Sequence, residues 1–409
     1  MCGIAGILFE TAQPRERLQP ATAAMAAAIL HRGPDDSGGW LKPEIGLALG
    51  QRRLSILDLS PAGHQPMPSR SGRYMMVFNG EIYNHLELRA DMPDEVWRGG
   101  PDTETLLAAI ERWGLEEALR RSVGMFALAV WDDQTRQLSL ARDRMGEKPL
   151  YYGWNKSRFL FASELKAFHA APDFSAAVDR DALGLYLTYG YVPAPWTIYD
   201  RIRKLEPGTL LALDLAQGTT GASETVQRYW SLHAALEAKP FAGSDQDAVD
   251  ALEEHLRRAV KLQMIADVPV GAFLSGGIDS SVVVALMQQY AGKPVRTFSI
   301  GFEEKKYNEA HHAANVARHL HTDHTELTVS ADDALSVIPR IPDIWDEPFA
   351  DSSQIPTLLL SALARRDVTV SLSGDGGDEL FWGYNSYPLA HRVETLPAGR
   401  LVGKTIHGL

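Results

Sequence analysis

Residues 270–286 read VGAFLSGGIDSSVVVAL, and this stretch decides the fold class of the C-terminal half. An apolar, β-branched run ends at Ser275, two glycines follow, and a helix is expected to start between Asp279 and Ser281. Glycines let the backbone turn tightly beside an anion, and the N–H groups of a helix N-terminus attract negative charge. The stretch therefore predicts a phosphate-binding loop. The alternative is a plain strand-to-helix turn with Asp279 or Ser280 as the helix cap.

A second stretch, VTVSLSGDGGDELFWGY at 368–384, repeats the pattern of an apolar run followed by a turn rich in glycine and acid. From about residue 244 onward, strand-like and helix-like segments alternate. That order predicts a parallel sheet with helices on its faces, in which such loops meet at the carboxyl edge of the strands. Asp279 and Asp378 would then share a magnesium ion bound to phosphate. A solvated acidic turn is the alternative for Asp375, Asp378 and Glu379.

The N-terminal half has a different residue pattern, in which short strand-like segments of alternating polarity are separated by Gly, Pro and Asn. We expect helices near 21–31 and 103–121, and a hairpin in GMFALAVWDDQTRQLSLARD (124–143) with DDQT as its turn. Hairpins mixed with a few helices indicate α+β layers. A proline-containing segment at 189–208 marks a connector. The expected division is a first domain over 2–205, a connector with an early second-domain strand over 206–243, and a second domain over 244–409.

Bulk composition excludes several classes of protein. The 409 residues carry a formal charge of −12, which argues against a general nucleic-acid binder. No apolar run is long enough for a membrane helix, so membrane insertion is not expected. Cys2 is the only cysteine, which excludes an internal disulfide, leaves too few ligands for a Cys/His zinc cluster, and predicts a cytoplasmic location.

The second half resembles a known family. SGGIDSS at 275–281 looks like the pyrophosphate loop of the N-type ATP pyrophosphatases, which activate a carboxylate by adenylation. Together with SGDGGDELFWGY (373–384) and DEPFADSSQIPT (346–357), it resembles the glutamine-hydrolysing asparagine synthetases and their amidotransferase relatives. The resemblance implies an α/β parallel-sheet ATP-pyrophosphatase domain that uses ATP and Mg²⁺, with Asp346 and Asp351 beside the acceptor. The implied ATP-binding residues are Phe273, Leu274, Ser275, Gly276, Gly277, Asp279, Ser280, Ser281, Ile300, Ser373, Gly374 and Asp375.

The N-terminal half resembles a class II glutamine amidotransferase. MCGIAGI at 1–7 matches the start of these enzymes, whose cysteine becomes the terminal residue once methionine is removed. A terminal cysteine carries its own α-amine, with a pKa of about 7.7–8.0, so one residue can supply both nucleophile and base. The implied fold is an αββα N-terminal-nucleophile hydrolase sandwich. Further matching motifs are HRGPDDSG (31–38), RRLSILD (52–58), FNGEIYNH (78–85), GPDTE (100–104), RDRMGEKPLYY (142–152) and ASELKA (162–167).

The family pattern assigns the oxyanion hole of the Cys2 reaction to the Asn79 side chain and the Gly80 N–H. The alternative is that Asn79-Gly80 serves only as a hairpin turn. An arginine suits the glutamine carboxylate and acidic residues suit its ammonium, although each could instead be a solvated surface charge. The family alignment favours Arg53 over Arg52. The implied glutamine-binding residues are Arg53, Leu54, Ser55, Ile56, Asn79, Gly80, Glu81 and Asp102.

The resemblance implies an ATP-dependent amidation in which glutamine supplies ammonia, carried inside the protein, to an acyl-adenylate. The most direct substrates are L-glutamine and L-aspartate, with asparagine, glutamate, AMP and pyrophosphate as products. A sugar or cell-wall carboxylate is an alternative acceptor, since Asp375 stands where some asparagine synthetases carry glutamate and does not decide between them.

Other functions stay open at this point. One is glutaminase activity alone, because family members usually extend further and the second domain is expected to be incomplete at its C-terminal end. A nonenzymatic ATP sensor and a glutamine-dependent phosphoribosyl or sugar-phosphate transferase are the others. A homodimer is compatible with the resemblance.

Overall fold

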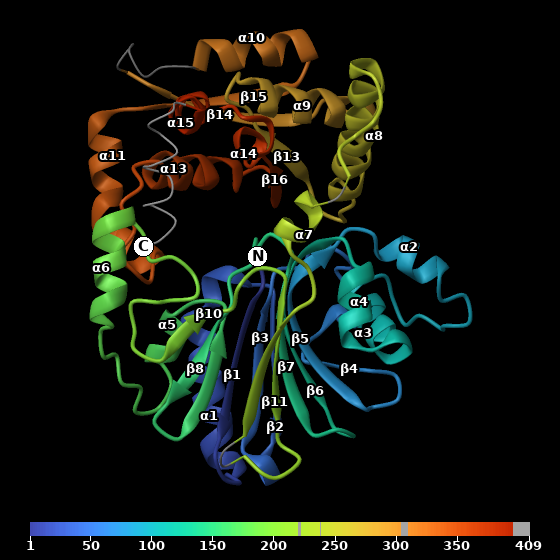
Figure 1. The fold of residues 1–409 in the computed structure, drawn as a ribbon, viewed down its shortest axis with the longest axis vertical. Helices are drawn as coiled ribbons and strands as arrows, with labels where there is room; N and C mark the ends of the chain where they lie inside the picture. The colour runs from blue at the N-terminus through green and yellow to red at the C-terminus, as the bar shows by residue number, and fades with distance from the viewer. Residues whose placement is uncertain (220–221, 238, 304–309, 396–409) are drawn as a thin grey trace. The chain divides into compact units, whose positions relative to one another are not determined.

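The structure is a computed structural model that describes residues 1–219, 222–237, 239–303 and 310–395. The chain forms two compact units (Figure 1). Unit 1 comprises Met1–Ala248, Ile265–Asp267 and Ser336–Gln354, and unit 2 comprises Val249–Met264, Val268–Leu335 and Ile355–Leu409. No helix in the described ranges combines the length and apolarity needed to cross a bilayer.

Unit 1 is built on two six-stranded antiparallel sheets that pack face to face. The first sheet has the order β10-β8-β9-β1-β3-β2, and the second has the order β12-β11-β7-β6-β5-β4. The strands of the first sheet are β1 (Gly3–Phe9), β2 (Asp36–Lys42), β3 (Leu47–Arg53), β8 (Tyr151–Asn155), β9 (Arg158–Ala162) and β10 (Ile202–Lys204). Those of the second sheet are β4 (Met67–Pro68), β5 (Tyr74–Ile82), β6 (Gly124–Asp132), β7 (Gln137–Arg142), β11 (Thr209–Asp214) and β12 (Ser223–Arg228).

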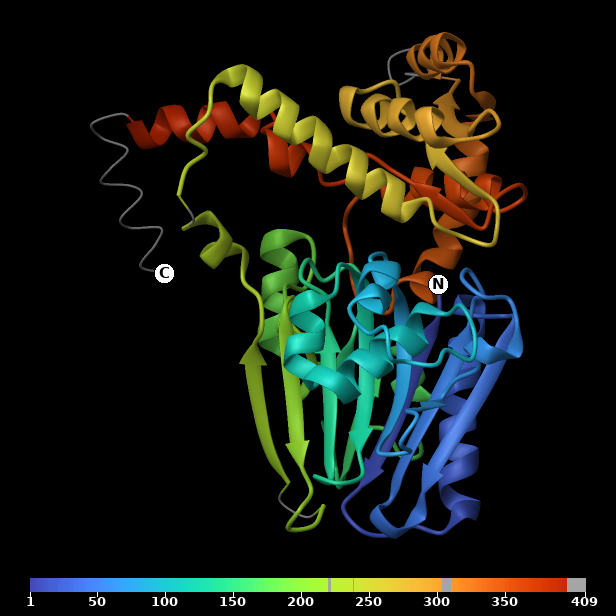
Figure 2. The same ribbon diagram turned by 90° about the vertical axis from the view of Figure 1, so that its right-hand side faces the viewer.

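Helices cover the outer face of each sheet, and this completes the predicted αββα sandwich (Figures 1 and 2). Helices α1 (Arg15–Ala28) and α5 (Lys166–His169) pack on the first sheet, and α3 (Asp102–Trp113) and α4 (Leu115–Arg121) pack on the second. Because central strands are covered on both faces, they read as apolar runs, and every residue of β1 is buried. The remaining helices of unit 1 are α2 (His85–Ala90), α6 (Arg180–Tyr189), α7 (Leu232–Leu236) and α12 (Ile341–Ile344).

The predicted hairpin at 124–143 is confirmed, since β6 ends at Asp132 and β7 begins at Gln137. The first helix, expected near 21–31, begins earlier at Arg15 and contains Pro20. The segment 206–243, expected to be a connector with a strand of the second domain, instead contributes β11 and β12 to the second sheet of unit 1. Alternate residues of β11 are buried, which ties that strand to this core.

The hairpin-turn alternative for Asn79-Gly80 is wrong. Both residues lie inside β5, where Asn79 pairs with Ala127 and Gly80 pairs with Phe126 of β6. A Cβ on Gly80 would lie 2.2 Å from the carbonyl oxygen of Met125, so close strand approach explains the glycine.

Unit 2 contains the predicted parallel sheet, in the order β15-β14-β13-β16. One face packs against α8, α9 and α10 through an apolar cluster that includes Ala272 and Leu274, and the opposite face packs against α13 through Phe298. The strands are β13 (Val270–Phe273), β14 (Arg296–Phe302), β15 (Asp323–Val329) and β16 (Val370–Leu372). The helices are α8 (Asp245–Gln263), α9 (Ile278–Tyr290), α10 (Ala310–Leu320), α11 (Ala331–Val337), α13 (Gln354–Ala364), α14 (Gly377–Phe381) and α15 (Ser386–Thr395).

Candidate active site

Cys2 lies immediately before β1, at the centre of the first sheet. Its Sγ lies 3.4 Å from the Leu54 amide nitrogen and 3.5 Å from the Leu54 carbonyl oxygen, and its own carbonyl oxygen accepts a 2.8 Å hydrogen bond from Arg32 Nε. Burial raises the pKa of the Cys2 thiol, although the hydrogen bond from Leu54 opposes the shift. A thiol in this setting needs a base to become a nucleophile, and the α-amine exposed by removal of Met1 can supply it.

Most of the residues predicted to bind glutamine come together around this thiol. They border a cavity of about 40 Å³ together with Met1, whose side chain forms part of the wall. Removal of Met1 would therefore both free the α-amine of Cys2 and enlarge the cavity. The cavity is lined by Met1, Cys2, Arg53, Leu54, Ile56, Leu57, Gln65, Phe78, Asn79, Gly80, Glu81, Pro101, Asp102, Thr103, Met125 and Lys148.

Asn79 is fully buried, yet its side chain makes no hydrogen bond with any of the described residues. Leaving a buried amide without a partner costs about 1–3 kcal/mol, so such groups are rare in folded proteins. The amide lines the same cavity as Cys2. The Asn79 amide is therefore in a position to donate a hydrogen bond to an oxygen within the cavity.

Two buried carboxylates face the cavity. Asp102, the first residue of α3, accepts hydrogen bonds from the Ile82 N–H at 2.7 Å and the Thr103 N–H at 2.9 Å. Oε1 of Glu81 has no hydrogen-bond partner among the described residues. Burial, helped by the charge of Asp102 and opposed by Lys148, raises the pKa of Glu81 to about 7. Such a pair is suited to a cationic ligand group.

The two adjacent arginines are separated by strand alternation. Arg53 lines the cavity, where its Nη1 donates to the Ser60 carbonyl oxygen at 3.0 Å. Arg52 turns the other way, and its Nε donates to the Ala26 carbonyl oxygen of α1 at 3.3 Å. Leu54 and Ile56 also line the cavity, whereas the N–H of Ser55 is bonded to Asp35.

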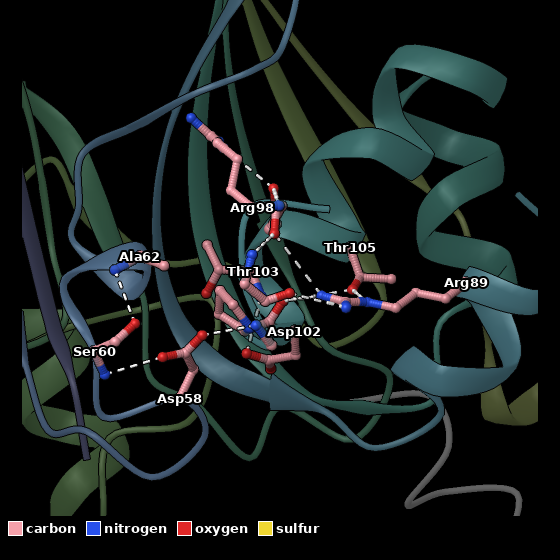
Figure 3. Close-up of polar contacts among 12 residues, drawn as sticks. Asp58, Ser60, Ala62, Arg89, Arg98, Asp102, Thr103 and Thr105 are labelled. Atoms are coloured by element: carbon pink, nitrogen blue, oxygen red, sulfur yellow. Dashed lines mark hydrogen bonds and ion pairs between the residues drawn. The ribbon is translucent and has the colours of Figure 1, made fainter. Parts of the chain in front are cut away.

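The loop before Asp102 is held by charged residues that the sequence analysis did not single out (Figure 3). Arg89 donates to the Pro101 carbonyl oxygen at 3.1 Å and to Thr105 Oγ1 at 2.7 Å. Asp58, which ends the RRLSILD motif, accepts from the Gly100 N–H at 2.7 Å. These bonds fix the start of α3 and hence the position of the Asp102 carboxylate.

Lys148 is a further cavity residue without a role assigned from sequence. It is buried, and its Nζ lies 3.1 Å from Met1 Sδ. Burial lowers the pKa of Lys148, although Glu147 opposes the shift. The only signal in the sequence was its place in the matched motif RDRMGEKPLYY.

The predicted phosphate loop of unit 2 follows β13. Gly277 is the N-cap of α9 and no side chain caps that helix, so the alternative of Asp279 or Ser280 as the cap is wrong. Gly276 adopts a φ of +83°, and a Cβ there would lie 2.7 Å from the Ala313 nitrogen. The Ser275 hydroxyl lies 3.0 Å from the Ser280 hydroxyl. The loop therefore presents a helix N-terminus and two hydroxyls at the carboxyl end of the sheet.

The second loop, after β16, packs against the first. A Cβ on Gly374 would lie 2.7 Å from the Ser280 nitrogen, and a Cβ on Gly377 would lie 2.5 Å from Asp279 Cγ. Asp279 and Asp378 occupy the first turns of α9 and α14, respectively. The described ranges contain no cluster of three or more His, Cys, Asp or Glu that could hold a metal by themselves.

The remaining predicted ATP-binding residues lie on the sheet or in these loops. Phe273 ends β13, the Leu274 N–H donates to the Phe298 carbonyl oxygen at 2.9 Å, and Ile300 lies in β14. In the second loop, the Ser373 hydroxyl donates to Asp375 at 3.0 Å.

The two predicted acceptor residues belong to unit 1. Asp346 is largely buried and its Oδ1 lies 2.9 Å from Lys166 Nζ. Asp351 is exposed and accepts a hydrogen bond from the Ser353 N–H at 2.8 Å.

Each half of the chain matches a known protein family. Residues 1–230 match the glutamine amidotransferase domain family, and residues 251–405 match the asparagine synthase family. A Methanocaldococcus jannaschii homologue, named for glutamine-hydrolysing asparagine synthetase 2, is 37% identical over 415 residues, covering 96% of this chain and 78% of that protein. Asparagine synthetase (glutamine-hydrolysing) 1 of Bacillus subtilis is 35% identical over 409 residues, covering 98% of this chain.

The chain spans 62% of the length of that B. subtilis relative. Among solved structures, the B. subtilis glutamine phosphoribosylpyrophosphate amidotransferase aligns with a TM-score of 0.41 at 16% identity, covering 79% of this chain and 65% of that chain.

Proposed function

The chain belongs to the family of glutamine-hydrolysing asparagine synthetases, and from this premise we propose that it uses glutamine and ATP to amidate a carboxylate. The observation that carries the proposal is the cavity at Cys2, where the buried Asn79 amide, which has no hydrogen-bond partner among the described residues, lines the same space as the thiol. The most direct acceptor is L-aspartate, which would yield asparagine, glutamate, AMP and pyrophosphate.

In the first reaction, the α-amine of Cys2 takes the thiol proton and the sulfur attacks the side-chain carbonyl carbon of glutamine. The oxyanion that forms is stabilised by the Asn79 amide and the Gly80 N–H. As this intermediate collapses, the protonated α-amine of Cys2 returns its proton to the leaving nitrogen, the C–N bond breaks and ammonia departs. Water then cleaves the thioester, which gives glutamate and restores the Cys2 thiol. Arg53 binds the glutamine carboxylate, and Glu81 and Asp102 bind its ammonium.

In the second reaction, the acceptor carboxylate attacks the α-phosphorus of ATP and pyrophosphate leaves. Ammonia then attacks the acyl-adenylate carbonyl and displaces AMP. The turn at Gly276 and Gly277, the first turn of α9 and the adjoining Ser373–Asp375 loop are the proposed phosphate site.

We propose that this site takes a magnesium ion. Asp279 and Asp378 would hold it, since Mg²⁺ is typically bound by one or two protein carboxylates, with phosphate and water as its other ligands. When bound, the ion would neutralise charge on the phosphate oxygens. The Gly377 backbone approaches Asp279 so closely that an added Cβ would lie 2.5 Å from Asp279 Cγ, and this supports a shared role for the two loops.

The acceptor is the least constrained part of the proposal. DEPFADSS (346–353) is proposed to border the acceptor pocket. Asp351 is exposed and can contact the acceptor, whereas Asp346 forms an ion pair with Lys166. An acceptor of the sugar or cell-wall class would use the same chemistry. A chain that hydrolyses glutamine without forming an amide is the further alternative.

The test incubates the full chain with glutamine, ATP, Mg²⁺ and aspartate while glutamate, pyrophosphate and asparagine are quantified. The proposal expects all three products, and pyrophosphate should depend on the acceptor. A panel of sugar acids and peptide carboxylates replaces aspartate in parallel. If glutamate forms but no acceptor leads to pyrophosphate, the chain has glutaminase activity alone. If no glutamate forms, the proposal is contradicted.

A further inference from the structure

Side chains of alternating charge lead from the backbone of Cys2 to the segment Ser336–Gln354, within unit 1. Arg32 donates through Nε to the Cys2 carbonyl oxygen and through Nη1 to Glu164 Oε1 at 2.6 Å. Glu164 is also paired with Lys166, whose Nζ lies 2.9 Å from Asp346 Oδ1. The order of charges along this row is plus, minus, plus, minus.

The row begins at a residue that needs to be held. A terminal residue is usually mobile, yet here it is the proposed nucleophile. Cys2 precedes the first paired residue of β1, so its place depends on the contact of its sulfur with Leu54 and on the bond from Arg32 to its carbonyl oxygen. The orientation of Arg32 in turn depends on Glu164, which is positioned at the end of β9 beside β1.

Lys166 joins the two ends of the row. Asp346 accepts from its Nζ and also from its backbone N–H at 3.0 Å, so the carboxylate is fixed at two points. Burial alone would raise the pKa of Glu164, but Arg32 and Lys166 lower it to about 2. Removing Asp346 would leave Lys166 a cation with a single acidic partner and release the start of α5.

We propose that Asp346 is a positioning residue for glutamine hydrolysis, acting on Cys2 through Lys166, Glu164 and Arg32. The segment that carries the proposed acceptor motif is then also a structural support of the nucleophile. This inference rests on the proposed glutaminase reaction.

The chain offers a matched control in the neighbouring residue. Glu347 is buried to a similar degree, with 13% of its side chain exposed against 9% for Asp346. It pairs with Lys204 and accepts from the Ile198 N–H at 3.2 Å. Within the part of the chain that the structure describes, neither partner is hydrogen-bonded to Cys2, Arg32 or Glu164. Asp346→Asn and Glu347→Gln each remove one buried charge from the same segment.

The experiment measures glutaminase kcat and KM for both variants and for Lys166→Met, in the full chain with removal of Met1 checked by intact mass. Alkylation by iodoacetamide is followed in parallel, and it reports on Cys2 alone because the chain has one cysteine. Asp346→Asn and Lys166→Met should lower kcat about 10-fold and change KM less than about 2-fold. Alkylation should become faster, because a released terminus exposes the thiol.

Glu347→Gln should keep wild-type kcat and alkylation rate, and Asp346→Asn should add little to the loss caused by Lys166→Met. Equal effects of Asp346→Asn and Glu347→Gln, or wild-type kcat in both Asp346→Asn and Lys166→Met, would overturn the inference. If one of these two variants does not fold, the other decides. If wild type releases no glutamate, the proposed function has failed, and the alkylation comparison still tests the link.

Discussion

Replacing Asn79 with alanine should abolish most turnover while leaving the fold at least as stable. The side chain is 0% exposed, and neither of its polar atoms has a partner among the described residues. Loss of one donor from an oxyanion hole typically lowers kcat by about 10²–10³-fold, equivalent to about 2.7–4 kcal/mol of transition-state stabilisation. Removing an unpaired buried amide also removes a desolvation penalty of about 1–3 kcal/mol, which offsets the small cavity created.

The matched control lies five positions further along the same strand and loop. Asn84 is also buried, but its amide donates to the Arg121 carbonyl oxygen at 3.0 Å and accepts from the Val123 N–H at 2.8 Å. Asn84→Ala leaves these two groups unpaired, so it should lower the free energy of unfolding by about 1–3 kcal/mol. Its kcat should stay near the wild-type value because Asn84 does not line the cavity.

The assay combines glutamate release at saturating glutamine with urea unfolding of wild type and both variants. We expect opposite profiles, with activity lost in Asn79→Ala and stability lost in Asn84→Ala. Wild-type kcat in Asn79→Ala would refute the oxyanion role. So would a loss of stability in Asn79→Ala as large as that in Asn84→Ala, because the amide would then have a structural partner.

Three further predictions concern pH and the phosphate loops. Because the pKa of Glu81 is raised to about 7, protonation should weaken ammonium recognition, so kcat/KM for glutamine should fall as pH drops through 7. Glu81→Gln should remove the Glu81 part of this fall and leave the part that comes from protonation of the Cys2 α-amine. Gly374→Ala would place a Cβ 2.7 Å from the Ser280 nitrogen, so ATP binding measured by calorimetry should weaken at least about 10-fold. Gly292→Ala is the control and should bind ATP normally, because a Cβ there meets no described atom within 4 Å. The pKa of Glu164 is lowered from 4.5 to about 2. The ionised carboxylate therefore stabilises the fold by about 3 kcal/mol above pH 4.5, and this stabilisation is lost as pH falls toward 2. In Glu164→Gln, the free energy of unfolding should depend less on pH over that range.

The resemblance to class II glutamine amidotransferases, rather than any local pattern, named Cys2, Asn79, Glu81 and Asp102 as parts of one candidate site. All four line the same cavity. The glycine-rich stretch after β13 predicted a strand, a tight turn and a helix, and the structure has all three, because that signal lies within consecutive residues.

The features that were missed depend on pairing between distant segments. Asn79-Gly80 carries a strong local turn signal, but hydrogen bonding to β6 makes it part of a long central strand. The strand expected within 206–243 is placed in the second domain by sequence alone, because nothing nearby in sequence indicates that β11 pairs with β7. Likewise, the bond from Lys166 to Asp346 spans 180 positions, and no periodicity or motif spacing encodes such a contact.

The central claim is that Cys2 is the nucleophile of a glutaminase, and one comparison tests it most directly. Glutamate release from glutamine is measured for wild-type chain lacking Met1 and for Cys2→Ala at equal concentration, with circular dichroism confirming that both are folded. We expect steady glutamate release by the wild-type chain and none above background by Cys2→Ala. Equal rates of release from the two proteins would contradict it.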